Sequence, residues 1–235
     1  MSGKYGFLYT SEKIPKLPHI DHRYVRQELS RAYPWMVWNT SVLEGYDFTL
    51  SEVESIINGS SVANHPIPHV DDLRGIAAGW RVALDAMDGN KPANEQLARS
   101  INHAITRGTS LAPGMFRCDP HDFGGDGGNV HTPRGGYTAP LPQDIRNLWD
   151  NFDEYDVVVR SFLRIPFITR LQPFWDGNKR TAVMLSAVDL INNGYPPLIV
   201  EAGSFDRWHI ALTGLFIDDD ADSLIECLSA SVLKI

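Results

Sequence analysis

The residues best suited to chemistry lie close together, in the stretch from Gln172 to Val183 that reads QPFWDGNKRTAV. Gly177 lets the backbone come close to an anion, because glycine adopts positive φ at no steric cost. A helix that begins at about Asn178 would point its free N–H groups at that anion. Lys179 and Arg180 add positive charge, and a guanidinium can hold phosphate through two parallel hydrogen bonds. The residue types and their spacing therefore indicate a polyphosphate site.

A carboxylate stands directly before the glycine. Asp176 supplies the kind of oxygen ligand that Mg²⁺ takes when it also holds phosphate, so it is the candidate metal ligand. The alternative is an ordinary turn between two core helices, with charged side chains that are only solvated. For a lone Gly-Asn-Lys-Arg sequence we would favour that alternative, but the full order of residues is more demanding.

That order resembles the motif of the Fic/Doc family, H-x-F-x-D/E-G-N-G/K-R, which is often followed by x-x-R. The residues that fit the motif, either directly or through its lysine-bearing variant, are Phe174, Asp176, Gly177, Asn178, Lys179 and Arg180. Two positions depart from it. Gln172 stands where the family has its histidine, and Val183 stands where many members have a second arginine.

A second stretch resembles the inhibitory helix of many Fic proteins, whose pattern is (S/T)-x-x-x-E-G/N. Here it runs from Thr40 to Gly45, within an inhibitory helix expected at about 39–46. Asn39 or Thr40 could cap this short helix, and Gly45 could end it in a left-handed turn. Read without the resemblance, the stretch is an ordinary capped helix that carries a solvated Glu44.

The resemblance implies that Glu44 points at the nucleotide site and blocks productive placement of the γ-phosphate of ATP. In the family this glutamate pairs with the second motif arginine, which is Val183 here. Either another cation, such as Lys179 or Arg180, takes that role, or the inhibitory contact is loose.

The resemblance also implies a reaction, with ATP and Mg²⁺ as cofactors. The family histidine takes the proton of a target hydroxyl, whose oxygen attacks the α-phosphate of ATP, so that AMP is attached and pyrophosphate leaves. The catalytic positions are then Gln172, Asp176 and Arg180. The nucleotide would be held by Phe174, which is buried below the loop, and by Gly177, Asn178, Lys179 and Arg180. A glutamine amide can hydrogen-bond a hydroxyl but cannot accept its proton at neutral pH. Losing a general base typically slows a reaction by about 10²–10⁴-fold.

Four activities stay open at this point. The first is AMP transfer to a protein hydroxyl, slowed by Gln172 or helped by a substitute base. The second is a module that binds a nucleotide or a protein without turnover. The third is a kinase like Doc, in which Lys179 favours a flipped ATP. The fourth is removal of AMP from a protein, with Glu44 placing the water.

The elements that must position these residues are mainly helical, and the resemblance implies an all-α Fic-fold bundle with a small β-hairpin flap. An N-terminal arm and helix (1–38) would precede a Fic-like domain (39–235). Apolar residues at helical spacing predict helices at 21–32, 49–57, 70–87, 93–106, 143–152, 157–169, 182–192, 205–216 and 224–233.

The segment 119–142 is dense in Gly, Pro, Asp and His and has little apolar periodicity. Loops of this length in compact domains are usually functional sites or linkers. In Fic proteins the equivalent stretch is a flap that holds a target by strand addition. Arms at 129–132 and 136–139, joined by a turn at 133–135, would form it here. The expected partner is a target protein that docks a Ser, Thr or Tyr hydroxyl on residues 129–140.

Composition and charge limit the partners and the cellular compartment that fit the chain. The chain has 235 residues and a formal net charge of −8, which argues against nucleic acid and membrane surfaces as partners. Cys118 and Cys227 are far apart and have no Cys or His at zinc spacing, which fits a reducing compartment. No signal peptide or membrane-spanning run is expected, so the default location is the cytoplasm. A homodimer is one of the assemblies that the sequence leaves open.

Overall fold

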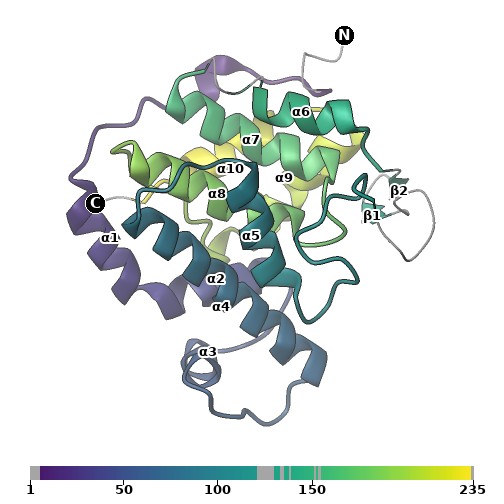
Figure 1. The fold of residues 1–235 in the computed structure, drawn as a ribbon. Helices are drawn as coiled ribbons and strands as arrows, with labels where there is room; N and C mark the ends of the chain where they lie inside the picture. Colours follow the sequence, from purple (N-terminus) through teal and green to yellow (C-terminus); the bar gives the residue numbers. More distant parts are fainter. Residues whose placement is uncertain are drawn as a thin grey trace.

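The computed structural model describes residues 6–120, 130–132, 135–137, 139–150, 152 and 155–233 (Figure 1). Helices make up most of this part of the chain, which confirms the predicted all-α class. The α-helices are α1 (His22–Arg31), α2 (Tyr33–Leu43), α3 (Leu50–Ile57), α4 (Ile67–Asp88), α5 (Glu95–Thr106), α6 (Pro142–Asp150), α7 (Val157–Leu171), α8 (Asn178–Asn192), α9 (Phe205–Ile217) and α10 (Asp222–Ala230). Two 3₁₀ turns, Ser11–Lys13 and Ala202–Ser204, complete the helical elements of the described ranges.

Helix α8 lies at the centre of the bundle. It is almost entirely apolar after its first turn, and most of its residues from Thr181 to Ile191 are buried. Helices α4, α5 and α7 pack around it. A helix that is apolar on all sides is stable only when neighbours cover all of them, so α8 fixes the places of the others. The first turn of α8 carries the predicted phosphate-binding residues.

Helix α7 leads directly to that site and is buried along most of its length. It runs through Pro166 and ends at Leu171. The helix therefore continues past the proline and ends two residues later than predicted. A proline inside a helix removes one backbone hydrogen bond, and dense packing against α8 offsets that loss.

Helices α4 and α5 approach each other closely because of two glycines. A Cβ built on Gly75 would lie 2.0 Å from the carbonyl oxygen of Ile105. One built on Gly79 would lie 2.5 Å from the Ile105 side chain. Contacts this short cannot exist, so only glycine permits this spacing. The close approach holds α5 where it can support the loop before α8.

The inhibitory stretch differs from its prediction at the N-terminal end. Residues 39–43 do not begin a short helix but complete α2, which starts at Tyr33 with Pro34 in its first turn. Asn39 and Thr40 were therefore wrongly predicted as caps. Each donates to the carbonyl four residues earlier, as a residue inside a helix can. Proline is favoured in a first helical turn, so the helix begins upstream. The expected boundary between residues 38 and 39 falls inside α2.

The flap is present as a β-hairpin. Strand β1 (Val130–Thr132) pairs antiparallel with β2 (Gly135–Tyr137), with Val130 opposite Tyr137. The second arm begins one residue earlier than predicted, while residues 129, 133, 134 and 138 lie outside the described ranges. The hairpin projects from one edge of the helical body (Figure 1).

The N-terminal arm is irregular, as predicted, but it is anchored. The backbone N–H of Leu8 donates to the Asp219 carbonyl at 2.7 Å, and Phe7 is fully buried. Thr10 donates from its backbone and hydroxyl to the Asp222 carboxylate. The arm is therefore part of the packed body from residue 7 onward.

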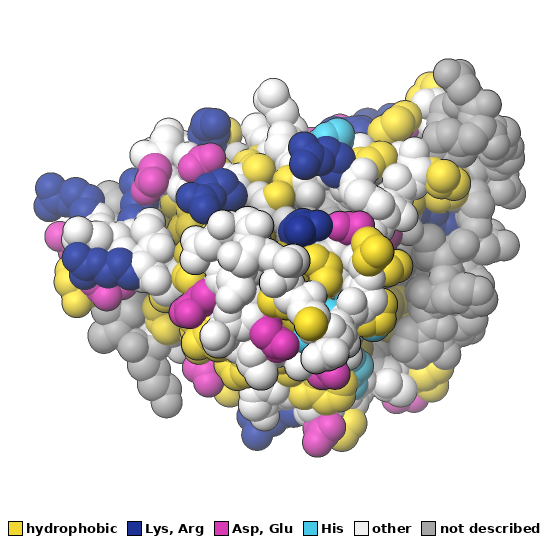
Figure 2. Space-filling model, turned by 90° about the horizontal axis from the view of Figure 1, so that it is seen from below, with side chains coloured by type: hydrophobic (Ala, Val, Ile, Leu, Met, Phe, Trp, Pro, Cys, Tyr) yellow, Lys and Arg dark blue, Asp and Glu magenta, His cyan; other side chains and the backbone are white. Residues whose placement is uncertain are grey.

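Figure 2 shows the molecule from below relative to Figure 1, and this face carries charges of both signs. Acidic and basic side chains are interspersed over this face (Figure 2). Among the helices of the described ranges, none combines the length and apolar composition that crossing a bilayer requires.

The glycine contact between α4 and α5 can be tested by adding a single methyl group. Gly75→Ala should lower the free energy of unfolding by about 1–3 kcal/mol through overpacking. Helix propensity alone would raise that free energy by about 1 kcal/mol, so the two effects have opposite signs. Urea denaturation gives the answer, with Gly108→Ala as control because nothing lies within 4 Å of a Cβ there. A stabilised Gly75→Ala protein would contradict this account of the packing.

Candidate functional site

The loop between α7 and α8 is shaped by two left-handed residues. Gln172 ends α7 at φ 51°, and Gly177 precedes α8 at φ 72°. A Cβ on Gly177 would lie 2.9 Å from the Thr106 side chain, so glycine is required both for its conformation and for space. The helix starts at Asn178, where the sequence predicted it.

Asn178 ties the loop to the start of α8. Its side-chain oxygen accepts the Phe174 N–H at 2.8 Å, and its amide nitrogen donates to the Phe174 carbonyl at 3.0 Å. The same nitrogen donates to the side-chain oxygen of Gln172 at 3.0 Å. The side chain is buried, so these bonds satisfy groups that water does not reach.

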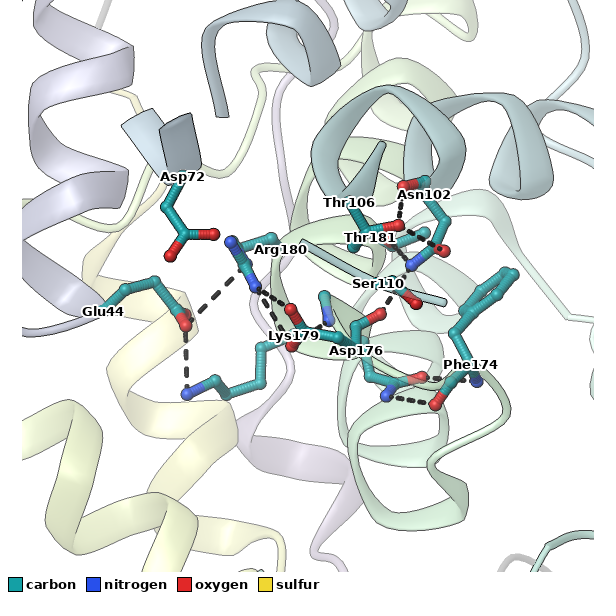
Figure 3. A network of polar contacts seen from close by, with 12 residues as sticks. Glu44, Asp72, Asn102, Thr106, Ser110, Phe174, Asp176, Lys179, Arg180 and Thr181 are labelled. Atoms are coloured by element: carbon teal, nitrogen blue, oxygen red, sulfur yellow. Dashed lines mark hydrogen bonds and ion pairs between the residues drawn. The ribbon is translucent and has the colours of Figure 1, made fainter. Parts of the chain in front are cut away.

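Asn102 on α5 supports the same loop from the other side, and the sequence analysis did not identify it (Figure 3). Its amide nitrogen donates to the Asp176 carbonyl at 2.8 Å and to the Thr181 hydroxyl at 3.1 Å. Its side-chain oxygen accepts the Gly114 N–H at 3.1 Å. The one available signal was an amide on the apolar face of a predicted helix, beside Ile101 and Ile105.

The segment before the flap packs against the loop. Phe174 is 1% exposed, and its ring centroid lies 4.8 Å from that of Phe116. The Arg117 backbone N–H donates to the Pro173 carbonyl at 2.8 Å, and its guanidinium donates to the Gln172 carbonyl at 3.1 Å. The structure thus places Phe174 beneath the loop, where the resemblance implied a buried ring.

The Gln172 side chain is engaged within the loop itself. Its amide nitrogen donates to the Thr169 carbonyl at 2.6 Å, while its oxygen accepts from Asn178. An amide held in this way links the end of α7 to the start of α8. It offers no basic nitrogen at the position of the family histidine.

Four charged side chains meet in front of the loop, from the C-cap of α2, the loop and the first turn of α8 (Figure 3). The Arg180 guanidinium donates to both oxygens of Asp176 at 3.1 Å. Its Nε lies 3.7 Å from one oxygen of Glu44, and Lys179 Nζ lies 3.4 Å from the other. Glu44 therefore forms ion pairs with both cations in the first turn of α8, Lys179 and Arg180.

Gly45 permits this placement of Glu44. Helix α2 ends at Leu43, Glu44 is its C-cap, and Gly45 adopts φ 89°. The chain can turn there without strain, as predicted, and the Glu44 side chain stays close to α8. Thr40 lies one turn earlier and accepts the indole N–H of Trp80 at 2.9 Å, which fastens the end of α2 to α4.

Arg180 is the most buried charge of the group, at 6% exposed. Burial by itself lowers its pKa, but the neighbouring carboxylates of Glu44, Asp176 and Asp72 outweigh this, so its pKa is raised. Asp72 points toward Arg180 and accepts the Tyr46 hydroxyl at 2.5 Å (Figure 3). Burial and then that carboxylate raise the Tyr46 pKa. Both groups therefore keep their protons at all physiological pH values.

Little space remains beside the Glu44 contact. The hollow behind it has a volume of about 20 Å³ and is lined by Glu44, Lys179 and Arg180 and by apolar side chains that include Trp80 and Trp208. That is room for about one water molecule.

Asp176 is the residue placed best to meet a metal. Its carboxylate is 50% exposed, although it also accepts from Arg180 and from the Gly177 N–H at 2.6 Å. Within the described ranges no three His, Cys, Asp or Glu side chains gather to form a metal cage. The residues fit a Mg²⁺ that takes one carboxylate from the protein and its other ligands from phosphate and water.

The chain is similar to known proteins both in sequence and in fold. The Fic/DOC family model matches residues 92–190, which include α5, the loop and most of α8. The proteins named protein adenylyltransferase Fic from Culex quinquefasciatus and Aedes aegypti are each 25% identical to the chain over 185 residues. The alignments cover 72% of this chain and 34% of each relative. The chain thus spans about a third of the length of the curated relatives it matches.

Solved structures share the fold. Fic-1 (aa134–508) from C. elegans superposes with a TM-score of 0.70 at 14% identity, covering 97% of this chain and 65% of that one. A Fic domain containing signaling protein from Bacteroides thetaiotaomicron gives 0.69 at 18% identity, with 94% and 89% covered.

The support that Asn102 gives to the loop can be measured. Asn102→Ala removes the side-chain hydrogen bonds to the Asp176 carbonyl, the Thr181 hydroxyl and the Gly114 N–H and leaves buried groups unsatisfied, so the free energy of unfolding should fall by about 2–4 kcal/mol. Guanidinium denaturation measures this. The control is Asn58→Ala, an exposed residue after α3 that should change stability by less than about 0.5 kcal/mol. Equal stability of the two variants would contradict the role given to Asn102.

Proposed function

Because this chain belongs to the Fic/DOC family, we propose that it transfers AMP from ATP to a hydroxyl group of a target protein. The observation that carries the proposal is the loop that ends in Gly177 and opens onto the first turn of α8. No side chain caps this helix, so the N–H groups of its first turn can receive phosphate oxygens. Lys179 and Arg180 lie in the same turn.

The reaction would join the hydroxyl oxygen of the target to the α-phosphorus of ATP. The bond from that phosphorus to the pyrophosphate oxygen breaks, and pyrophosphate leaves with the electron pair. Such transfers depend mainly on positioning and on neutralising charge. The helix N-terminus and Arg180 would do this for the phosphates. A Mg²⁺ held by Asp176 would supply further positive charge when bound.

The proton of the target hydroxyl has no side-chain acceptor at position 172. It would pass to water, and the rate should therefore be about 10²–10⁴-fold below that of a protein with a base at this position. Gln172 is proposed to act by holding the loop in shape, with its amide between Thr169 and Asn178.

Glu44 is proposed to inhibit the site. It pairs with Lys179 and Arg180, so the cations that would hold phosphate already have an anionic partner. Triphosphate and Glu44 would compete for them, and two negative groups cannot occupy the same place without strong repulsion.

The target protein is proposed to dock on the hairpin at residues 129–140. A two-stranded hairpin has outer edges with backbone groups that an extended segment can pair with. That segment would present a Ser, Thr or Tyr hydroxyl to the loop. ATP is abundant in the cytoplasm, where Cys118 and Cys227 would stay reduced, and we propose that location.

A second candidate function is a module that binds a nucleotide or a protein without turnover. The observation that favours it is the engaged amide of Gln172 in place of a base. A kinase activity like that of Doc is favoured instead by Lys179 after Asn178, together with Val183 in place of the second arginine.

Labelled ATP separates these activities. The purified protein is incubated with a cell lysate and with ATP labelled on either the α- or the γ-phosphate. We expect protein labelling from α-labelled ATP only, and Gln172→His should increase it by about 10²-fold or more by restoring a base. Label from γ-labelled ATP alone would indicate the kinase. ATP binding with no label, unchanged in Gln172→His, would indicate the binding module and refute the proposal.

The inhibitory contact is tested by removing one charge. Glu44→Gln keeps the shape of the side chain but releases Lys179 and Arg180, so the affinity for ATP with Mg²⁺ should rise about 10-fold or more. Isothermal titration calorimetry measures this. Glu54→Gln, on the exposed face of α3, is the control and should bind ATP like the unaltered protein. If the affinity of Glu44→Gln is also unchanged, Glu44 does not guard the site.

A further inference from the structure

A large pocket lies far from the loop, at the other end of α8. It has a volume of about 610 Å³ and is lined by the α4–α5 connection, the end of α6, and parts of α7 and α8, whose positions are labelled in Figure 1. Sites for small molecules typically measure about 300–1,000 Å³. Asp189 on its wall follows Asn178 by eleven residues, which places them roughly 16 Å apart along the helix axis. The two regions share no lining residue with each other.

The deep end of this pocket is built from a buried ion cluster. Asp189 is 4% exposed and accepts from Nε and Nη2 of Arg160, both at 2.7 Å. It also accepts from Arg164 at 3.0 Å, whose side chain is 3% exposed. A buried ion cluster contributes little net stability compared with apolar packing of the same volume. What it does provide is two guanidinium groups held in fixed positions on the pocket wall.

The rim adds two cations and one carboxylate, Asp150, to the lining. Lys91 and Arg146 are exposed and line the pocket, and neither forms an ion pair with another described residue. Arg146 is steadied by a neutral partner, since its Nε and Nη2 donate to the side-chain oxygen of Gln143. Of the acidic residues on the wall, Glu95 instead faces Arg99, outside the pocket, at 2.8 Å. The lining therefore holds four cations (Lys91, Arg146, Arg160 and Arg164) and three carboxylates (Glu95, Asp150 and Asp189), in a chain whose net charge is −8.

The pocket also has an apolar side. Trp149 from α6 lines it together with Pro92 and Ala93. The Arg164 guanidinium carbon lies 5.9 Å from the centroid of the Trp149 ring, so a flat surface and a fixed positive charge adjoin. A ligand that uses both must carry a negative group next to a flat apolar one.

We propose that this pocket binds a small organic anion in which a phosphate or carboxylate is attached to a flat apolar group. Lys91 and Arg146 would receive the negative group, and the guanidinium groups of Arg160 and Arg164 line the same cavity. Trp149 would cover the apolar part. The proposal is independent of the AMP-transfer reaction, because none of these residues belongs to the loop between α7 and α8 or to the first turn of α8.

Two-dimensional NMR of the full chain tests this binding at a single residue. The indole N–H signal of Trp149 is identified by its loss in Trp149→Phe, and the protein is then titrated with phenyl phosphate and with benzoate. We expect a saturable shift of that signal with at least one of them, and the tighter of the two identifies the phosphate or the carboxylate as the preferred group. Inorganic phosphate should bind more weakly than phenyl phosphate. No shift with either compound, or equal binding by uncharged benzyl alcohol, would overturn the proposal.

Matched variants then place the anion. Lys91→Gln and Arg146→Gln alter exposed side chains, so folding is not at risk, and each should weaken binding about 3–10-fold. Arg74→Gln removes an exposed arginine of α4 that pairs with Asp71, outside the pocket, and should leave binding unchanged. Binding that is the same in all three variants would show that the rim cations do not hold the ligand, and the assignment would fail.

Discussion

Two buried asparagine side chains hold the loop between α7 and α8 in one shape. Asn178 closes the loop on itself through both backbone groups of Phe174, and Asn102 fixes it to α5 through the Asp176 carbonyl. A polar group in the protein interior costs free energy unless it is hydrogen-bonded. Any other shape of the loop would leave several buried polar groups without a hydrogen-bond partner. The directions of Asp176, Lys179 and Arg180 all follow from this anchoring. The close packing of α4 on α5 in turn holds Asn102 in place.

Charge balance sets the state of the site. The first turn of α8 carries two cations, yet Glu44, Asp176 and Asp72 surround the more buried of them. Lys179 and Arg180 cannot bind Glu44 and a phosphate group fully at the same time. On the proposed function, the end of α2 and the nucleotide therefore compete for one pair of positive charges. The fold makes this competition possible because the chain turns at Gly45, just after α2, and leaves Glu44 in front of α8.

Features with a local cause could be predicted from the sequence, and features set by packing could not. The left-handed turns at Gly45 and Gly177 and the start of α8 at Asn178 follow from the conformational freedom of glycine. The hairpin was expected from the resemblance to Fic proteins and not from a local pattern. Asn102 escaped notice because its role depends on which face of α5 meets the loop. Asn39 and Thr40 were misassigned since Pro34 starts α2 upstream and leaves both residues inside the helix. The sequence could not identify the partners of Glu44 either, because they lie on a helix more than 130 residues away along the chain.

The most direct test of the account is a crystal structure of the full chain with Mg²⁺ and a non-hydrolysable ATP analogue. The account predicts the triphosphate against the N–H groups that open α8, with the α-phosphate facing residue 172 and Glu44 withdrawn from Lys179. A nucleotide bound elsewhere, or one bound at the loop while the Glu44 contacts persist unchanged, would contradict it.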